Sequence, residues 1–517
     1  MWTRRLLPLA AALLAGGAGA EEEPLSAIDW LSRPRDEAGA PATRAERGAP
    51  PPVSGVADAI PTNPIRVTPL GAPEPGAAGV LPTSVTGLPR ALWAGSDPER
   101  LAGLLRDLPW LGVPAADELA ETLMLAEADP PRGATRAEAE ALLLARIDQL
   151  VERGALDAAR ALIERAGART PERRRRAFDA ALLLGDETSA CQAVDSDPRT
   201  EGDYARRVFC LLRRGDWAAG ALTFDGARAL GALDPVEEAL LATFIDEEMA
   251  EGPLPPAPAQ PTPLAFRLYD ALGQSVPTGD LPVAYALADL REVTGWKAQL
   301  EAAERLARAG AMDGNALLGL LTEREPSASG GVWDRVAAIQ ALDAALGESD
   351  AGAVAAALPA AWSAMTEAGT TVALAPALAP RLDGLALAGR AAEIALRLAL
   401  LAPGFEATAR GWDGGGVPEV EALLAVARGE PPPMPGGGDP LARAVTAGFD
   451  GAPAPQRLAA LAGAGRLGEA LLSVVSDVAQ AREGDLQRLP DALRFLREAG
   501  LEDAARRVAL QLLILEV

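Results

Sequence analysis

The chain has no histidine among its 517 residues. Without imidazole groups it cannot form Ser-His-Asp or Cys-His nucleophile systems, histidine-ligated zinc sites or imidazole general bases. It also lacks a glycine-rich phosphate loop followed by Lys-Ser or Lys-Thr, and it lacks the Gly-x-Ser-x-Gly turn of hydrolases. We therefore predict no catalytic residues, no metal site and no cofactor.

Carboxylate chemistry stays open, because glycoside cleavage needs only two acids at a suitable separation. The 72 Asp and Glu residues fall mostly on predicted helix surfaces, so the sequence singles out no pair. A carboxylate-dependent enzyme acting on cell-wall glycan is thus the alternative to a non-enzymatic function. The net charge of −24 repels nucleic acid and anionic lipid surfaces, which argues against nucleic acid as a partner.

Cysteine is scarce, with only Cys191 and Cys210 in the chain. A turn-forming stretch, residues 195–203, lies midway between them and places them opposite each other on two antiparallel helices. In an oxidising compartment this arrangement predicts a disulfide. The competing interpretation, a redox-active pair, needs closer spacing or an activating base.

Beyond the first residues the chain has no uncharged run long enough to span a bilayer. Residues 1–20 are typical of a secretory signal peptide, with Arg4 and Arg5 before an apolar run and Ala18-Gly19-Ala20 at the cleavage site. We expect an exported, periplasmic protein that has no membrane span after signal cleavage.

Strand-type alternation is almost absent, whereas apolar residues recur at helical spacing. Helical patterns stop at Gly154, Gly185 and Gly215, about 30 residues apart, as in helix-turn-helix repeats. Looser joints follow at four further glycines, Gly310, Gly347, Gly465 and Gly500. The predicted fold is all-α: irregular antiparallel helical-hairpin repeats, a tetratricopeptide-like α-solenoid.

Composition divides the chain into segments at its proline- and glycine-rich breaks. After the signal peptide we predict a disordered Pro/Ala-rich leader, an N-terminal helical-repeat domain, a middle helical domain and C-terminal helical hairpins, at residues 21–88, 89–252, 264–429 and 441–517. The leader contains a short apolar motif, residues 25–32.

Several residues are candidates for contacting a partner. In the leader motif these are Ile28, Trp30 and Leu31, which form an apolar cluster in a polar tail and could dock on a partner or on the chain itself. Trp296 and Trp333, with Arg335, follow glycines at predicted helix starts; packing between hairpins is the alternative for the tryptophans. The basic run at residues 173–176 is either a solvated face paired with acids or a docking site for an acidic partner.

Three segments carry a resemblance: residues 22–32, residues 294–299 and residues 330–335, which read EEPLSAIDWLS, TGWKAQ and GGVWDR. Together they resemble a family of exported alphaproteobacterial α-helical repeat proteins, some of which are labelled "antifreeze glycopeptide polyprotein". That label implies Ala-Ala-Thr repeats, whereas the threonines of this chain are scattered. The resemblance implies an exported helical protein and no catalytic residue.

The repeat pattern, the motif around Trp30 and the missing catalytic groups favour a non-enzymatic periplasmic scaffold or adaptor. We expect it to bind a protein or peptide partner through a helical-repeat surface.

Overall fold

The structure is a computed structural model that describes residues 75–109, 112–195, 203–246, 253–412, 414–433 and 439–515. The chain divides into two units, residues 1–68 and 69–517, and all elements below belong to the second. Within the described ranges every regular element is a helix, and an isolated parallel bridge joins Leu81 to Ala126. The predicted all-α fold class is confirmed. No helix in these ranges has both the length and the apolarity that a membrane crossing requires.

The first group of helices precedes the proline-rich break near residue 253. It comprises η1 (Pro75–Ala77), α2 (Thr83–Thr86), α3 (Pro98–Arg106), α4 (Pro114–Leu125), α5 (Arg136–Glu152), α6 (Leu156–Ala166), α7 (Pro171–Leu183), α8 (Glu187–Asp195), α9 (Tyr204–Arg213), α10 (Trp217–Ala229) and α11 (Pro235–Ile245).

The second group lies between the two proline-rich breaks. It comprises α12 (Pro263–Ala271), η3 (Val283–Leu290), α13 (Trp296–Arg308), α14 (Gly314–Leu321), α15 (Val332–Glu348), α16 (Ala351–Ala368), α17 (Thr371–Leu382), α18 (Arg390–Leu401), α19 (Phe405–Gly411) and α20 (Pro418–Arg428).

The last group follows the second break. It comprises α21 (Pro440–Gly448), α22 (Gln456–Gly463), α23 (Leu467–Arg482), η4 (Leu486–Arg488), α24 (Leu489–Glu498) and α25 (Glu502–Leu515).

Glycines in the left-handed conformation end the helices that the sequence marks. Gly154, Gly185 and Gly215 have φ of +77°, +79° and +83° and follow α5, α7 and α9. After Gly154, the N–H of Ala155 donates to the carbonyl of Leu150 at 2.9 Å, which is the hydrogen bond of a Schellman cap. These joints are confirmed because a residue without Cβ adopts positive φ at little cost.

The joint predicted at Gly347 is wrong by two residues. Gly347 lies inside α15, which ends at Glu348; the C-cap residue that follows, Ser349, has a φ of +55°. The next residue, Asp350, caps the start of α16 by accepting hydrogen bonds from the N–H groups of Gly352 and Ala353. A strong N-cap therefore places the boundary, and a serine takes the conformation that glycine favours.

Residues 75–88 belong to the folded part of the chain, although the sequence assigns them to the leader. The Val80 and Leu81 N–H groups both donate to the carbonyl of Leu125. The Arg146 guanidinium, fully buried, donates to the carbonyls of Ala78, Met124 and Ala126 at 2.8, 2.6 and 3.0 Å. Contacts from distant residues, with no apolar period of their own, therefore hold this segment.

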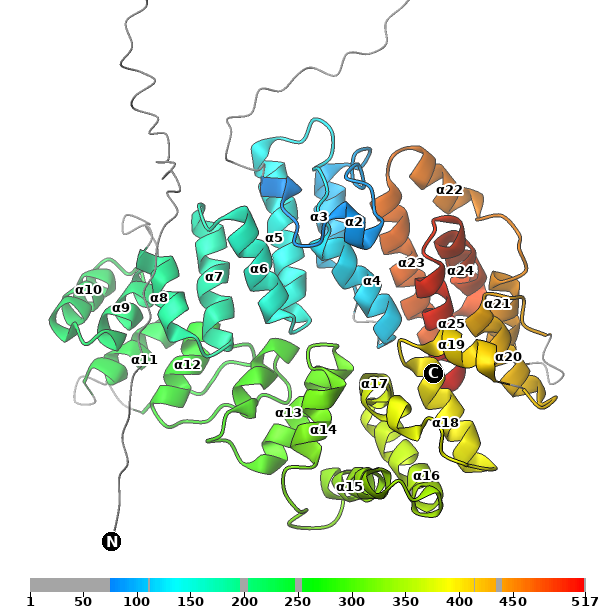
Figure 1. Cartoon of the computed structure of the whole chain (residues 1–517). Coiled ribbons are helices and arrows are strands. Elements are labelled where there is room, and N and C mark those ends of the chain that lie inside the picture. Colours follow the sequence, from blue (N-terminus) through cyan, green and yellow to red (C-terminus); the bar gives the residue numbers. More distant parts are fainter. Residues whose placement is uncertain are drawn as a thin grey trace, which may run out of the picture. The chain divides into compact units, whose positions relative to one another are not determined.

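The helical array closes on itself. Successive helices such as α5, α6 and α7 pack against one another, and α23 and α25 then pack against α4 (Figure 1). Two backbone hydrogen bonds reinforce this closure: Gly95 N–H donates to the Gly465 carbonyl at 2.9 Å, and Gly468 N–H donates to the Leu92 carbonyl at 3.0 Å. The last helices of the unit are therefore neighbours of α3 and α4 near its start.

Two main hydrophobic cores support the array. The larger contains residues from Ala78 to Ile514 and draws on all three groups of helices. The smaller lies among α7 to α12, where the rings of Phe178 and Phe209 meet edge to face at 6.3 Å. The described helices of the three predicted helical domains thus share one large core.

Candidate functional site

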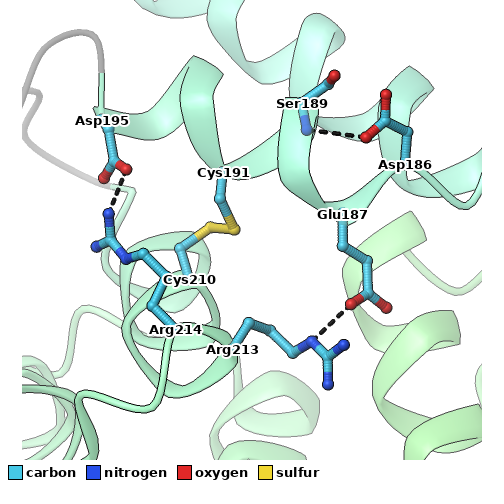
Figure 2. The surroundings of a disulfide bond; sticks show 8 residues. All are labelled: Asp186, Glu187, Ser189, Cys191, Asp195, Cys210, Arg213 and Arg214. Atoms are coloured by element: carbon cyan, nitrogen blue, oxygen red, sulfur yellow. Dashed lines mark hydrogen bonds and ion pairs between the residues drawn. A yellow bond between two sulfur atoms is a disulfide. The ribbon is translucent and has the colours of Figure 1, made fainter.

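The disulfide predicted between Cys191 and Cys210 is present. It joins α8 to α9 with a Cα–Cα distance of 5.4 Å. Figure 2 shows two ion pairs beside it that connect the same helices: Arg213 with Glu187, and Arg214 with Asp195. The bond and its flanking charges therefore fasten one helical hairpin.

The structure brings Trp296 and Trp333 together. Their ring centroids are 5.3 Å apart, so the starts of α13 and α15 meet through the two indoles. Trp296 is 8% exposed, and its Nε1–H donates to the carbonyl of Leu320 at 3.3 Å. The contact agrees with the packing interpretation, and a role in partner binding stays a prediction.

Arg335 is paired inside the fold. Its Nε and Nη2 donate to the two oxygens of Glu304 at 2.8 and 2.6 Å, and a second carboxylate, Glu367, lies 3.6 Å from Nη1. Glu304 is buried, so this fork ties α15 to α13. The Glu304 hydrogen bond raises the pKa of Arg335, which stays charged. The charge of Arg335, a candidate for partner binding, is therefore already neutralised by Glu304 and Glu367.

The basic run at residues 173–176 is engaged with the protein's own groups. Arg173 is buried against Glu140 at 2.9 Å, whereas Arg175 pairs with Asp203 and Arg176 with Asp148, at 2.8 and 2.7 Å. Pairing with nearby acids is thus observed, but Arg173 and Arg174 are buried instead of solvated. The candidate residues Ile28, Trp30 and Leu31 lie outside the described residues.

A pocket of about 440 Å³ lies at the closure of the array. Its walls come from the start of α4, η3, the end of α13, the junction of α16 and α17, the end of α23 and the end of α25. Arg305, Arg308 and Arg482 line it, and none of the described lining residues is acidic. This volume is typical of pockets for small ligands or single side chains.

Two of these arginines have no partner in the described part of the chain. Neither Arg308 nor Arg482 makes a hydrogen bond or ion pair there, and both are exposed. Arg305 donates to the carbonyls of Thr278, at 2.6 Å, and Leu281. Burial and the charge of Arg308 lower the pKa of Arg305, whereas the nearby charges of Asp280 and Asp289 raise it. Neither of these acids lines the pocket.

Two carboxyl groups elsewhere have the properties of potential general acids. Burial raises the pKa of Asp179 and of Glu237, and the charge of Asp179 raises the pKa of Glu237 further. The charge of Arg206 lowers the pKa of both carboxyl groups and so opposes the effect of burial. Asp179 accepts hydrogen bonds from Arg206 at 3.2 and 3.4 Å, and Glu237 accepts one from Thr262 at 2.8 Å. A raised pKa favours the protonated form of a carboxyl group, which is the form that donates a proton.

Sequence reasoning did not identify the pocket arginines as a site. Arg308, Arg482 and their glycine neighbours are dispersed over a large part of the chain, and no local motif connects them. The available signal was weak: each arginine ends an apolar helical pattern, which ordinarily indicates interaction with the helix dipole.

Comparison with protein-family models, with curated proteins and with solved structures finds no match for this chain.

Proposed function

We propose that the chain is an exported, periplasmic scaffold or adaptor that binds a protein or peptide partner without catalysing a reaction. Its helical hairpins are proposed to be irregular tetratricopeptide-like repeats, and the chain is proposed to belong to the exported family that its tryptophan segments resemble. One observation carries the binding function: the closed helical array has a pocket lined by unpaired arginines at its closure. Repeat arrays commonly bind partners along such composite surfaces.

The partner test uses the mature chain, residues 21–517, immobilised and exposed to periplasmic extract. A specific partner should be retained, released by free chain in excess, and cross-linked at the helical surface. A variant lacking residues 25–32 shows whether the leader motif contributes to retention. Recovery of the same proteins with an unrelated acidic exported protein would contradict the proposal.

The second candidate function is a carboxylate-dependent enzyme acting on cell-wall glycan. The raised pKa of Glu237 beside Asp179, which is paired with Arg206, favours it, because glycoside cleavage needs one protonated and one ionised carboxyl group. Release of soluble fragments from purified peptidoglycan, lost in Glu237→Gln, would decide for this candidate. Equal release by the variant would remove Glu237 from consideration.

A further inference from the structure

The pocket at the closure is positively charged in a protein with a strong excess of acids. With 72 Asp and Glu against 48 Lys and Arg, a carboxylate is available for most arginines. Several arginines elsewhere do find one, such as Arg153 with Asp117 at 2.5 Å. The fully buried Arg146 instead donates to backbone carbonyls. Arg308 and Arg482 have none in the described structure, although they line a concave site. Unpaired charge gathered in a pocket is a property that a bound anion would explain.

Gly369 and Gly112, which have no Cβ, leave room for the side chains of Arg308 and Arg482. A Cβ on Gly369 would lie 2.9 and 3.1 Å from the Cδ and Cγ of Arg308, and a Cβ on Gly112 would lie 3.0 Å from the Nε of Arg482. Both glycines have positive φ, +67° and +62°, which disfavours other residues there. The backbone at each glycine therefore lies close to the side chain of its arginine at the pocket wall.

The start of α17 adds further donors to the same pocket. Thr371 and Val372 line it, and Thr370 does not cap the helix with its side chain. The first N–H groups of a helix have no intrahelical acceptor and carry partial positive charge. The buried Thr371 hydroxyl has no hydrogen-bond partner, so an unsatisfied polar group lies beside the arginines.

We infer that this pocket binds an organic oxyanion, a ligand with a carboxylate or phosphate group and an apolar body. Arg308 and Arg482 would hold the oxyanion by charge-assisted hydrogen bonds. Val283, Val372 and Leu515, which line the same pocket, would contact the apolar body. The inference rests on the proposed binding function and names the chemical group by which the pocket would recognise its ligand.

Isothermal titration calorimetry of the purified chain at low ionic strength tests this inference. The probes are phenyl phosphate, phenylacetate and the neutral benzyl alcohol, which share an aromatic body and differ in charged group. We expect saturable binding of one molecule of at least one anion and none of benzyl alcohol. The anion that binds with the higher affinity shows whether phosphate or carboxylate is the preferred group. Absence of saturable binding by both anions overturns the inference.

Matched variants locate the binding. Arg308→Gln and Arg482→Gln should each weaken the anion about tenfold or more, because each removes a charge-assisted hydrogen bond. Arg390→Gln, at an exposed arginine outside the pocket lining, should leave binding unchanged. Melting curves of each variant verify the fold, and Arg308→Lys keeps the charge should the glutamine variant melt early. Anion binding that both glutamine substitutions leave unchanged overturns the inference.

The two proposals fail separately. A specific partner retained from periplasmic extract, with no anion bound by the purified chain, would leave the adaptor function intact and reject the oxyanion pocket. Saturable anion binding without any retained partner would support the pocket and reject the adaptor function.

Discussion

Replacing Gly468 with alanine tests how tightly the array closes. Gly468 is the second residue of α23, and a Cβ built there would lie 1.9 Å from Cζ3 and 2.1 Å from Cε3 of Trp93. The Trp93 side chain is fully buried, so its ring has no solvent to move into. The substitution therefore forces α23 away from the segment that precedes α3.

The magnitude follows from two opposing effects. Inserting a methyl group into a close-packed core costs about 1–3 kcal/mol, and a 1.9 Å contact with a rigid ring belongs at the upper end of that range. Alanine in place of glycine inside a helix contributes about 1 kcal/mol in the opposite direction. We expect Gly468→Ala to lower the free energy of unfolding by about 2 kcal/mol.

Urea unfolding followed by circular dichroism measures this change, and Gly103→Ala is the matched control. Gly103 lies within α3, where a Cβ would meet nothing within 4 Å. This variant should gain about 0.5–1 kcal/mol from helix propensity alone. The reasoning is refuted if Gly468→Ala is as stable as the wild type or gains stability as the control does.

Three further variants test other contacts. Arg146→Met should cost about 3 kcal/mol or more, because three buried carbonyls lose their donor; unchanged stability in a thermal melt would disprove the role of Arg146. Removing the disulfide with Cys191→Ala and Cys210→Ala should cost about 3 kcal/mol for its 19-residue separation, and equal melting of reduced and oxidised wild type would argue against that value. Burial alone would raise the pKa of Glu469, but hydrogen bonding from Arg466 holds it below the ordinary 4.5. Its contribution is therefore present above pH 4.5 and lost as pH falls through the lower folded-state value, so the stability difference between wild type and Glu469→Gln should shrink in acid. A difference that stays constant from pH 7 to pH 3 would contradict this.

Local chemistry explains what the sequence could predict. Gly154, Gly185 and Gly215 end their helices because only a residue without Cβ takes positive φ cheaply, and this is readable from one position. The disulfide was predictable because two cysteines placed symmetrically about a turn face each other. The helix end predicted at Gly347 was wrong because Asp350 caps the next helix, and this cap sets the boundary instead of the glycine.

The rest depends on contacts between distant residues. Arg173 reads as part of a surface charge run, yet it is buried because Glu140 and two backbone carbonyls meet it there. The pocket forms only when α13 and α23 approach the start of α4, and helical periodicity gives no information on which helices meet. The candidate site was therefore not predictable from local pattern.

An anomalous difference map from crystals of the whole chain soaked in selenate tests the central claim most directly. We expect α23 and α25 to pack against α4, and a selenate peak to lie in the pocket within hydrogen-bonding distance of Arg308 or Arg482. Crystals in which these helices do not meet, or in which selenate binds elsewhere while the pocket holds none, would contradict it.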